Sequence, residues 1–314
     1  MTSARPRITV IGSINMDLVV RCARLPAPGE TILADSSQEI CGGKGANQAV
    51  AAARAGGNVS MVGRVGDDGF ADRLAGNLEN EGIDCAWVQT TAGCASGVAV
   101  VAVEQSGQNA IMVVPGANGR VTVEDVHAAR GVIEASDIVL VQLEVPLDTV
   151  LTAMEVARSA GVRVILDPAP APIESPVELQ AELLQADLLC PNESEAAALT
   201  GLPVDTVSQV EDAARELQRR GAKSVAITLG EQGCLLRDGD QQTLIPPYPA
   251  TVVDTTAAGD AFAGALAVLW AEGAPLAEAV RFANAAGALA ASQTGAQPSM
   301  AHRTEITNHW RSQL

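Results

Sequence analysis

Short apolar runs alternate with longer stretches rich in Ala and Leu along most of the chain. Because both faces of each run are apolar, these runs are predicted to be strands buried in a sheet: residues 8–11, 59–62, 138–143, 162–166 and 225–229. The stretches between them show the spacing of helices: residues 45–55, 70–81, 123–135, 147–160 and 207–219. Strands that alternate with helices predict an α/β fold whose parallel sheet is covered by helices on both faces.

Two stretches depart from this alternation. Residues 18–40 carry Pro26, Pro28 and Gly29 and are predicted to be extended. Residues 96–114 contain two β-like runs, 98–103 and 110–114, joined by a Gln-Ser-Gly-Gln segment at 105–108 that predicts a hairpin. Together the two stretches are expected to form a small accessory sheet that projects from the core and serves as a lid.

The composition is that of a globular protein with a strong acidic balance. Of 314 residues, 47% are hydrophobic, and 37 Asp and Glu stand against 20 Lys and Arg, which gives a net charge of -17. Such a chain repels polyanions, so we expect neither a nucleic-acid partner nor an anionic membrane surface. Only two lysines are present, Lys44 and Lys223.

Cysteine and histidine usage argues against disulfides and a structural metal. The six cysteines form no C-x-x-C pair, and most lie in apolar segments, which indicates free thiols in a reducing compartment. The three histidines form no H-x-x-x-H pair. The N-terminal segment does not have the pattern of a signal peptide, and the longest apolar stretch is far shorter than the roughly 20 residues that span a bilayer. We therefore expect a cytoplasmic protein without a membrane partner.

The familiar nucleotide-binding loops are missing. The G-x-x-x-x-G-K-[ST] pattern is not met around Lys44, and the segment after residue 11 reads Gly-Ser-Ile-Asn instead of G-x-G-x-x-G. Any phosphate site must therefore be built differently.

Residues 251–264 are the most informative segment. A short β-like run ends in Asp254, small residues follow, and an apolar helix is predicted from near Gly259 to about Trp270. Free backbone N–H groups at a helix start favour a phosphoryl group. Asp260 lies in the first turn, where it would accept a proton from an attacking hydroxyl. An acidic residue that only interacts with the helix dipole is the alternative.

Two further segments contain residues suited to a polyol. Residues 42–49 read Gly-Gly-Lys-Gly-Ala-Asn-Gln-Ala, where the glycines allow close approach and Lys44 and Asn47 supply donors. A flexible loop with a helix cap is the alternative. Asn15 and Asp17 follow the first strand two positions apart, so they point the same way and suit vicinal hydroxyls. A simple turn would explain them equally well.

In this order, the segments resemble the ribokinase branch of the PfkB family of sugar kinases. The similarity runs from residue 8 to about 299 and includes GGKGANQA at 42–49 and DTTAAGD at 254–260. Further matches are QLE at 142–144, PNESE at 191–195, TLGEQG at 228–233 and GAQPS at 295–299. The resemblance implies a single three-layer α/β domain over residues 1–314, with a mostly parallel central sheet flanked by helices and a small β-sheet lid built from residues 15–43 and 95–118.

The resemblance also implies ATP-dependent phosphorylation of D-ribose at its 5-hydroxyl, which yields D-ribose 5-phosphate and ADP. Asp260 would be the base. The backbone N–H groups of Ala257, Ala258, Gly259 and Asp260 would stabilise the developing charge. The sugar would be held by Asn15, Asp17, Gly43, Lys44, Asn47 and Glu144, together with Asp260.

The same resemblance implies sites for the nucleotide and two metal ions. Asn192 and Glu195 would order Mg²⁺ and the phosphates, with Glu195 acting through water. The nucleotide would also contact Thr228, Gly230, Gly233, Gly259 and Asn284. An activating K⁺ would be bound by Asp254, Thr256, Ala290, Gln293, Gly295 and Ser299. The family further implies a homodimer formed through the lid sheet.

One departure and several alternatives remain. The family pattern after the base is Thr-Phe-Asn-Gly, whereas this chain has Ala261 and Ala263 at the two polar positions, so turnover could differ. The alternative substrates are deoxyribose, fructose and nucleosides. A catalytically silent sugar-binding member of the fold is a further alternative, whereas a dinucleotide-dependent oxidoreductase is disfavoured by the missing fingerprint.

Overall fold

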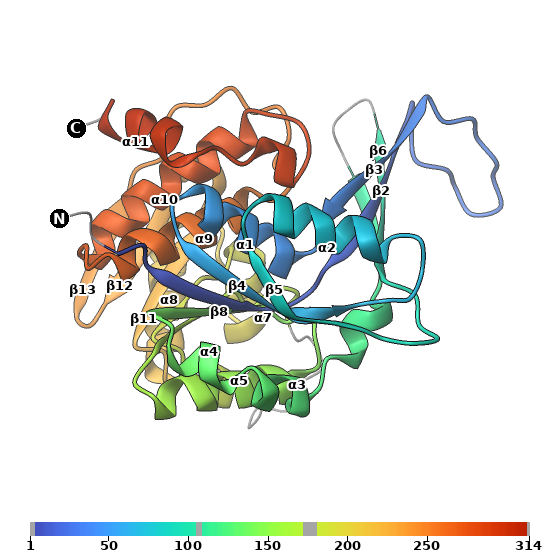
Figure 1. Cartoon of the computed structure of the whole chain (residues 1–314). Coiled ribbons are helices and arrows are strands. Elements are labelled where there is room, and N and C mark those ends of the chain that lie inside the picture. The colour runs from blue at the N-terminus through green and yellow to red at the C-terminus, as the bar shows by residue number, and fades with distance from the viewer. Residues whose placement is uncertain (1–3, 105–108, 172–180, 313–314) are drawn as a thin grey trace.

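The computed structural model describes residues 4–104, 109–171 and 181–312 and is built around a nine-stranded sheet (Figure 1). All its strand pairs are parallel except those that β12 and β13 make at one edge. The strands in spatial order are β13 (Gln241–Ile245), β12 (Cys234–Asp238), β11 (Ser224–Thr228), β10 (Leu188–Leu189), β9 (Arg163–Leu166), β8 (Ile138–Val141), β1 (Arg7–Ile11), β4 (Asn58–Val65) and β5 (Asp84–Thr90).

Helices cover both faces of this sheet, so its strands are buried on both sides (Figure 1). In β1, Ile8 and Val10 join one hydrophobic core and Ile11 joins the other. The first core is covered by α1 (Lys44–Arg54), α2 (Ala71–Asn80), α9 (Ala258–Ala271), α10 (Leu276–Ala291) and α11 (Arg303–Arg311). The second is covered by α3 (Val123–Ala128), α4 (Arg130–Glu134), α5 (Leu147–Ser159), α7 (Glu193–Thr200) and α8 (Val207–Arg219). The expected α/β layers are confirmed.

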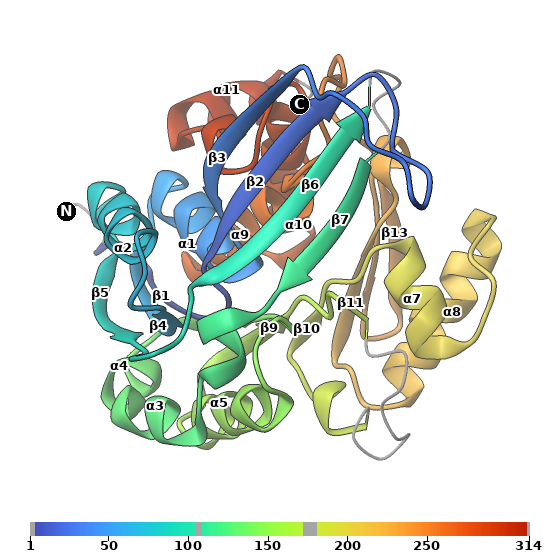
Figure 2. The same ribbon diagram turned by 90° about the vertical axis from the view of Figure 1, so that its right-hand side faces the viewer.

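A second, four-stranded sheet projects from one end of the core (Figure 1) and is seen face on in Figure 2. Its order is β3 (Ser36–Gly42), β2 (Asn15–Cys22), β6 (Gly97–Glu104) and β7 (Asn109–Val114). β2 pairs antiparallel with β3 and parallel with β6, and β7 pairs antiparallel with β6. The predicted accessory sheet is confirmed, although residues 23–35 form an irregular loop between β2 and β3. The predicted turn at 105–108 lies outside the described residues.

The structure corrects the sequence-based elements in two places. The helix predicted over 123–135 is divided at Ala129 into α3 and α4. The antiparallel pair β12 and β13 extends the sheet beyond the last predicted strand. Within the described residues, no helix is both long enough and apolar enough to cross a lipid bilayer.

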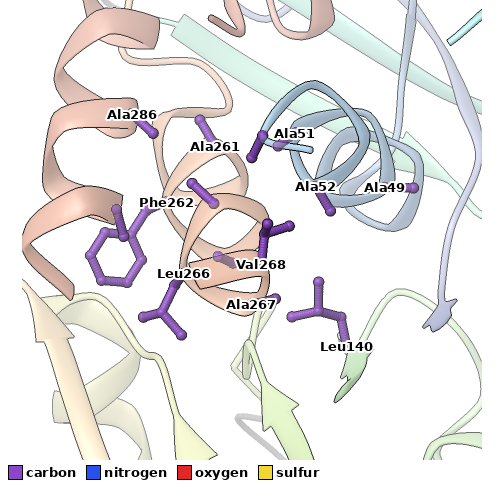
Figure 3. Close-up of a cluster of buried hydrophobic side chains, with 14 of the residues drawn as sticks. Ala49, Ala51, Ala52, Leu140, Ala261, Phe262, Leu266, Ala267, Val268 and Ala286 are labelled. Carbon is purple, nitrogen blue, oxygen red and sulfur yellow. The ribbon is translucent and has the colours of Figure 1, made fainter. Parts of the chain in front are cut away.

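The core above the sheet depends on close packing between α1 and α9 (Figure 3). At Gly264, an added Cβ would lie 2.6 Å from Ala51 Cβ and 2.7 Å from the Gln48 carbonyl oxygen. Ala261 and Ala263 are 3% and 1% exposed in this apolar cluster. A Thr or Asn at either position would bring a polar group into it, so the two alanines suit their surroundings.

We predict that Gly264→Ala lowers the free energy of unfolding by about 1 to 3 kcal/mol, because the new methyl group overpacks the contact between α1 and α9. Gly76→Ala in α2 is the matched control, since an added Cβ there meets nothing within 4 Å. That substitution should leave stability unchanged or raise it by up to about 1 kcal/mol. Urea unfolding of both variants measures the difference, and equal effects would contradict the packing argument.

Candidate active site

Asp260 lies in the first turn of α9, where two side chains of α1 meet it. It is 4% exposed. Its Oδ2 accepts a hydrogen bond from Asn47 Nδ2 at 2.9 Å, and its Oδ1 accepts one from Gln48 Nε2 at 3.2 Å. The close contact between α1 and α9 therefore brings the predicted base to the predicted sugar-binding loop.

The chain enters α9 through a strained residue. Ala257 has φ 59°, and in the described ranges it is the only non-glycine residue with a positive φ. Such a conformation is costly for a residue with a side chain and is retained where the surroundings require it. It immediately precedes the turn that carries Asp260.

The helix start offers fewer free donors than predicted. The Ala258 N–H donates to the Thr255 carbonyl at 3.2 Å. The N–H groups of Ala257, Gly259 and Asp260 have no acceptor among the described residues. Three of the four predicted N–H groups are thus available to an anion.

Glycines bring the loop before α1 against β2. An added Cβ at Gly43, where φ is 88°, would lie 2.7 Å from the Asn15 backbone nitrogen, and one at Gly42 would lie 2.1 Å from Asp17 Oδ2. Glu144 accepts hydrogen bonds from the Ser13 hydroxyl and from the Lys44 N–H. Glu144 therefore also ties the loop to the chain after β1.

Asn15 and Asp17 both lie on β2 but have different partners. Asn15 Oδ1 accepts a hydrogen bond from Asn118 Nδ2 at 2.6 Å. The Asp17 carboxylate receives no hydrogen bond from any residue that the structure describes. Burial, with added repulsion from Glu144 and Asp260, raises the pKa of Asp17 to about 7. Asn15, Asn118 and Glu144 line a cavity of about 370 Å³.

Lys44 does not point its ammonium group at the polyol pair. Its Nζ lies 3.4 Å from Asp167 Oδ2 and 3.9 Å from Asp260 Oδ1. Burial opposes the charged form of Lys44, but Asp167, Asp260 and Glu144 outweigh it and raise the pKa of this lysine. The predicted sugar-loop donor is thus an ammonium group shared between two carboxylates.

A cavity of about 610 Å³ lies on the other side of the start of α9. Its lining includes every residue predicted to contact the nucleotide except Glu195: Asn192, Thr228, Gly230, Gly233, Gly259 and Asn284. Asn284 Nδ2 donates to the Pro246 carbonyl at 3.0 Å, so this side chain also fixes part of the cavity wall.

Asn192 and Glu195 form the capping box of α7. Asn192 Oδ1 accepts from the Glu195 N–H at 2.9 Å, and Glu195 Oε2 accepts from the Asn192 N–H at 2.8 Å. Each side chain thus has a structural role. The second carboxylate oxygen of Glu195 has no hydrogen-bond partner among the described residues. The charge of Glu195 contributes to raising the pKa of both Lys44 and Asp167.

The residues predicted to bind potassium lie around Asp254. Asp254 Oδ1 accepts from the Thr256 N–H at 3.0 Å and Oδ2 accepts from the Gly295 N–H at 2.9 Å. The other predicted ligands, Ala290, Gln293 and Ser299, lie at the end of α10 and in the following loop. The Ala290 carbonyl accepts from the Gln293 N–H, and Ser299 Oγ donates to the Ala296 carbonyl. In the described part of the chain, no three His, Cys, Asp or Glu side chains are grouped to hold a metal ion.

The sequence analysis missed three buried polar residues beside Asp260: Gln48, Gln142 and Asp167. Gln142 and Asp167 directly follow β8 and β9. The carboxyl ends of parallel strands are where such sheets bind ligands, and that position was the available signal. Burial raises the pKa of Asp167 to about 7, and Asp260 and Glu195 add to the effect while Lys44 opposes it.

Residues 5–303 match the family described as pfkB family carbohydrate kinase. The chain is similar to the ribokinase of Bacillus subtilis, with 42% identity over 299 residues that cover 95% of this chain and 97% of the relative. It is also similar to the deoxyribokinase of Salmonella typhi, with 38% identity over 292 residues that cover 93% and 94% of the two proteins.

A solved structure extends the comparison. The Arabidopsis thaliana ribokinase complexed with ribose and ATP superposes with a TM-score of 0.88 at 36% identity, and the match covers 98% of this chain and 99% of that chain. The two chains share one fold over nearly their whole length, so the fold class that the resemblance implied is confirmed.

We predict that Asp17→Asn changes how stability depends on pH. The folded-state pKa of about 7 lies above the ordinary 3.8, so the stability that Asp17 contributes is fully present below about pH 4 and is lost between about pH 4 and 7. Asn has no such titration, so the stability of the variant relative to the wild type should be higher at pH 8 than at pH 5 by about 2 to 3 kcal/mol. Urea unfolding at both values tests this.

Asp212→Asn is the control, because Asp212 is a surface residue of α8 with 54% side-chain exposure. Its stability relative to the wild type should change little between the two pH values. If Asp17→Asn behaved like this control, the assigned pKa of Asp17 would be wrong.

Proposed function

The chain belongs to the pfkB family of carbohydrate kinases, and from that premise we propose that it transfers the γ-phosphoryl group of ATP to the 5-hydroxyl of D-ribose. The products would be D-ribose 5-phosphate and ADP. The ribose- and ATP-bound Arabidopsis ribokinase and the Bacillus subtilis ribokinase support this choice of substrates.

The observation that carries the proposal is that the start of α9 lies between the 610 Å³ cavity and the polar side chains of α1. Gly259 lines the 610 Å³ cavity. Asp260, the next residue, accepts hydrogen bonds from Asn47 and Gln48 of α1. A phosphoryl group at the free N–H groups of this helix start and a hydroxyl at the Asp260 carboxylate would therefore be neighbours, as phosphoryl transfer requires.

The sugar would satisfy polar groups that lack partners in the protein. The Asp17 carboxylate has no donor among the described residues, and two sugar hydroxyls would supply donors to it. Asn47 Oδ1 is buried and likewise lacks a described partner. With Asn15, Gly43, Lys44 and Glu144 around them, these acceptors favour a compact polyol.

Asp260 would then take the proton from the 5-hydroxyl of the sugar while the oxygen of that hydroxyl attacks the γ-phosphorus. The N–H groups of Ala257, Gly259 and Asp260 would stabilise negative charge that develops on the phosphoryl oxygens. Lys44, 3.9 Å from Asp260 Oδ1, would add a positive charge beside the reacting groups. The Ala258 N–H is engaged with Thr255, so its predicted part in this step would require the turn to open.

The nucleotide would occupy the 610 Å³ cavity, with the adenine near Asn284 and the phosphates toward Gly259. Thr228, Gly230 and Gly233 would form the loop along it. At Gly233, φ is 93° and an added Cβ would lie 2.2 Å from the Ile245 carbonyl oxygen. A residue with a side chain would therefore disturb this wall.

The residues also fit the two metal ions that the family implies. The free oxygen of Glu195 suits a hydrated Mg²⁺, which keeps most of its waters, and Asn192 lies beside it. Magnesium, when bound, would neutralise charge on the phosphates. Asp254 with oxygens from Thr256, Ala290, Gln293, Gly295 and Ser299 offers one carboxylate among neutral oxygen donors, which suits a monovalent cation such as K⁺.

We further propose that residues 15–43 and 95–118 form a lid on a single domain of residues 1–314. The outer strand β7 exposes a row of apolar side chains, including Ile111 at 53% and Met112 at 65% exposure. An exposed apolar edge strand favours contact with a second copy of the chain, so we propose a homodimer through this sheet. The six free cysteines favour a reducing compartment, and we propose the cytoplasm.

Deoxyribose is the second candidate substrate because of the Salmonella deoxyribokinase relative. It lacks one of the two vicinal hydroxyls that the Asn15 and Asp17 pair suits. A carboxylate that a bound sugar would cover but leave without a donor is costly, which favours ribose.

We predict that kcat/KM with ATP and Mg²⁺ in a K⁺ buffer is at least about tenfold higher for D-ribose than for 2-deoxyribose, because deoxyribose leaves Asp17 short of one hydroxyl donor. A coupled ADP-release assay with ribose, 2-deoxyribose, fructose and nucleosides measures the ranking. A preference for 2-deoxyribose or a nucleoside would contradict the ribose assignment.

We predict that Asp260→Asn lowers kcat by about 10²-fold or more, because an amide cannot accept the hydroxyl proton, while ATP binding stays nearly unchanged. Steady-state kinetics and ATP titration measure the two effects. Asp72→Asn is the matched control, since Asp72 is the acidic residue in the first turn of α2. Wild-type turnover in Asp260→Asn would leave Asp260 with only the helix-dipole role.

A further inference from the structure

A buried chain of polar side chains lies behind Asp260. Gln48 Nε2 donates to Asp260 Oδ1 at 3.2 Å and to Asp167 Oδ2 at 2.8 Å. Gln48 Oε1 accepts from Gln142 Nε2 at 2.6 Å. Both glutamines are 0% exposed and Asp167 is 6% exposed. Residues from three places, α1, the segment after β8 and the segment after β9, thus form one hydrogen-bonded group that ends at the Asp260 carboxylate.

The contacts to the two carboxylates set how the glutamines are oriented. Gln48 turns its amide nitrogen toward both Asp167 and Asp260, where the two N–H groups meet carboxylate oxygens that accept them. Its oxygen then faces Gln142, which must in turn present its own nitrogen. A reversed Gln48 amide would place its oxygen against the oxygens of both carboxylates. The two carboxylates therefore fix the orientation of the Gln48 amide, and Gln48 in turn fixes that of the Gln142 amide.

The hydrogen-bonded group of Gln48, Gln142 and Asp167 leaves one buried polar atom unpaired among the described residues, which costs stability. Gln142 Oε1 is buried and has no partner in the described part of the chain. An added Cβ at Gly12 would lie only 1.9 Å from that oxygen, so Gly12 leaves the space that Gln142 occupies. An apolar residue at 142 would remove the unpaired oxygen. Packing alone therefore does not explain why a glutamine is present.

We propose that Gln48 is a positioning residue for Asp260 and that Gln142 and Asp167 hold Gln48 in place. Asn47 holds one oxygen of the Asp260 carboxylate and Gln48 holds the other, so together they set the plane of the group. The inference rests on the proposed role of Asp260 as the base. A base that is misplaced by a fraction of an ångström or rotated loses efficiency without loss of substrate affinity.

Asp167 fixes the second hydrogen of the Gln48 amide. Its bond to Gln48 is shorter than the one that Gln48 makes to Asp260, and Lys44 Nζ approaches the same Asp167 oxygen at 3.4 Å. Asp167 therefore anchors the amide and leaves its other N–H directed at the base. Lys44 spans the same two carboxylates from the opposite end of the first turn of α1.

The test is Gln48→Met, which keeps the approximate volume of the side chain and removes the donor. We expect kcat to fall about 10- to 100-fold while KM for ribose and for ATP stays within about threefold. Gln142→Met, which removes only the partner of Gln48, should lower kcat by a smaller factor with the same unchanged KM values. Thr149→Val is the control, because Thr149 is 0% exposed and its hydroxyl bonds to the Val121 carbonyl far from Asp260. It should leave kcat unchanged.

A double-mutant cycle separates positioning from a general structural effect. If Gln48 acts through Asp260, adding Gln48→Met to Asp260→Asn should reduce kcat by less than about threefold further. The inference is overturned if kcat of Gln48→Met stays within twofold of the wild type, or if the two reductions multiply in the double variant. Should Gln48→Met fail to fold, Gln142→Met carries the same cycle. Wild-type turnover in Asp260→Asn alone would instead overturn the proposed function.

Discussion

The close contact between α1 and α9 is the constraint on which the site depends. Gly264 lets the two helix backbones approach until an added Cβ would touch the Gln48 carbonyl oxygen. That approach places Asn47 and Gln48, near the start of α1, against Asp260 at the start of α9, more than 200 positions away in the chain. Alanine is the most frequent residue in the apolar cluster beneath them, and its small side chain keeps the helices close (Figure 3). The packing of the core and the geometry of the site are therefore one arrangement.

The carboxylates gathered at the site repel one another and lower the stability of the fold, but they supply the groups that the proposed reaction needs. Asp167 is buried and Asp17 is partly buried, and the pKa of each is raised to about 7, in part by the charge of Asp260. The single ammonium group of Lys44 approaches two of these carboxylates. A polyphosphate would meet acidic surroundings, in keeping with the net charge of -17. Backbone N–H groups and bound cations are local devices that attract phosphate regardless of the overall charge.

Much of the fold follows from the sequence because apolar runs buried on both faces, as in β1 and β8, have a clear signature. The division of the helix at Ala129 and the antiparallel edge of β12 and β13 do not, because neither changes the local apolar pattern. Within the site, Asp260 and Asp17 are marked by the segments around them. Gln48 and Gln142 lie in marked segments and Asp167 follows a strand, but the pattern does not show their roles, which lie in contacts with one another.

The sequence by itself determined the order of strands and helices, the glycines that permit close approach, and the identity of the acidic and amide side chains. Only the tertiary structure decided which of them share hydrogen bonds. Lys44 illustrates the difference: its place in the glycine loop predicts a sugar contact, and the structure adds that its ammonium group lies within 4 Å of both Asp167 and Asp260. The physical reason is that a hydrogen bond depends on ångström-scale distance and direction. For residues 48, 142, 167 and 260, these are set by how α1, α9 and the ends of β8 and β9 pack together.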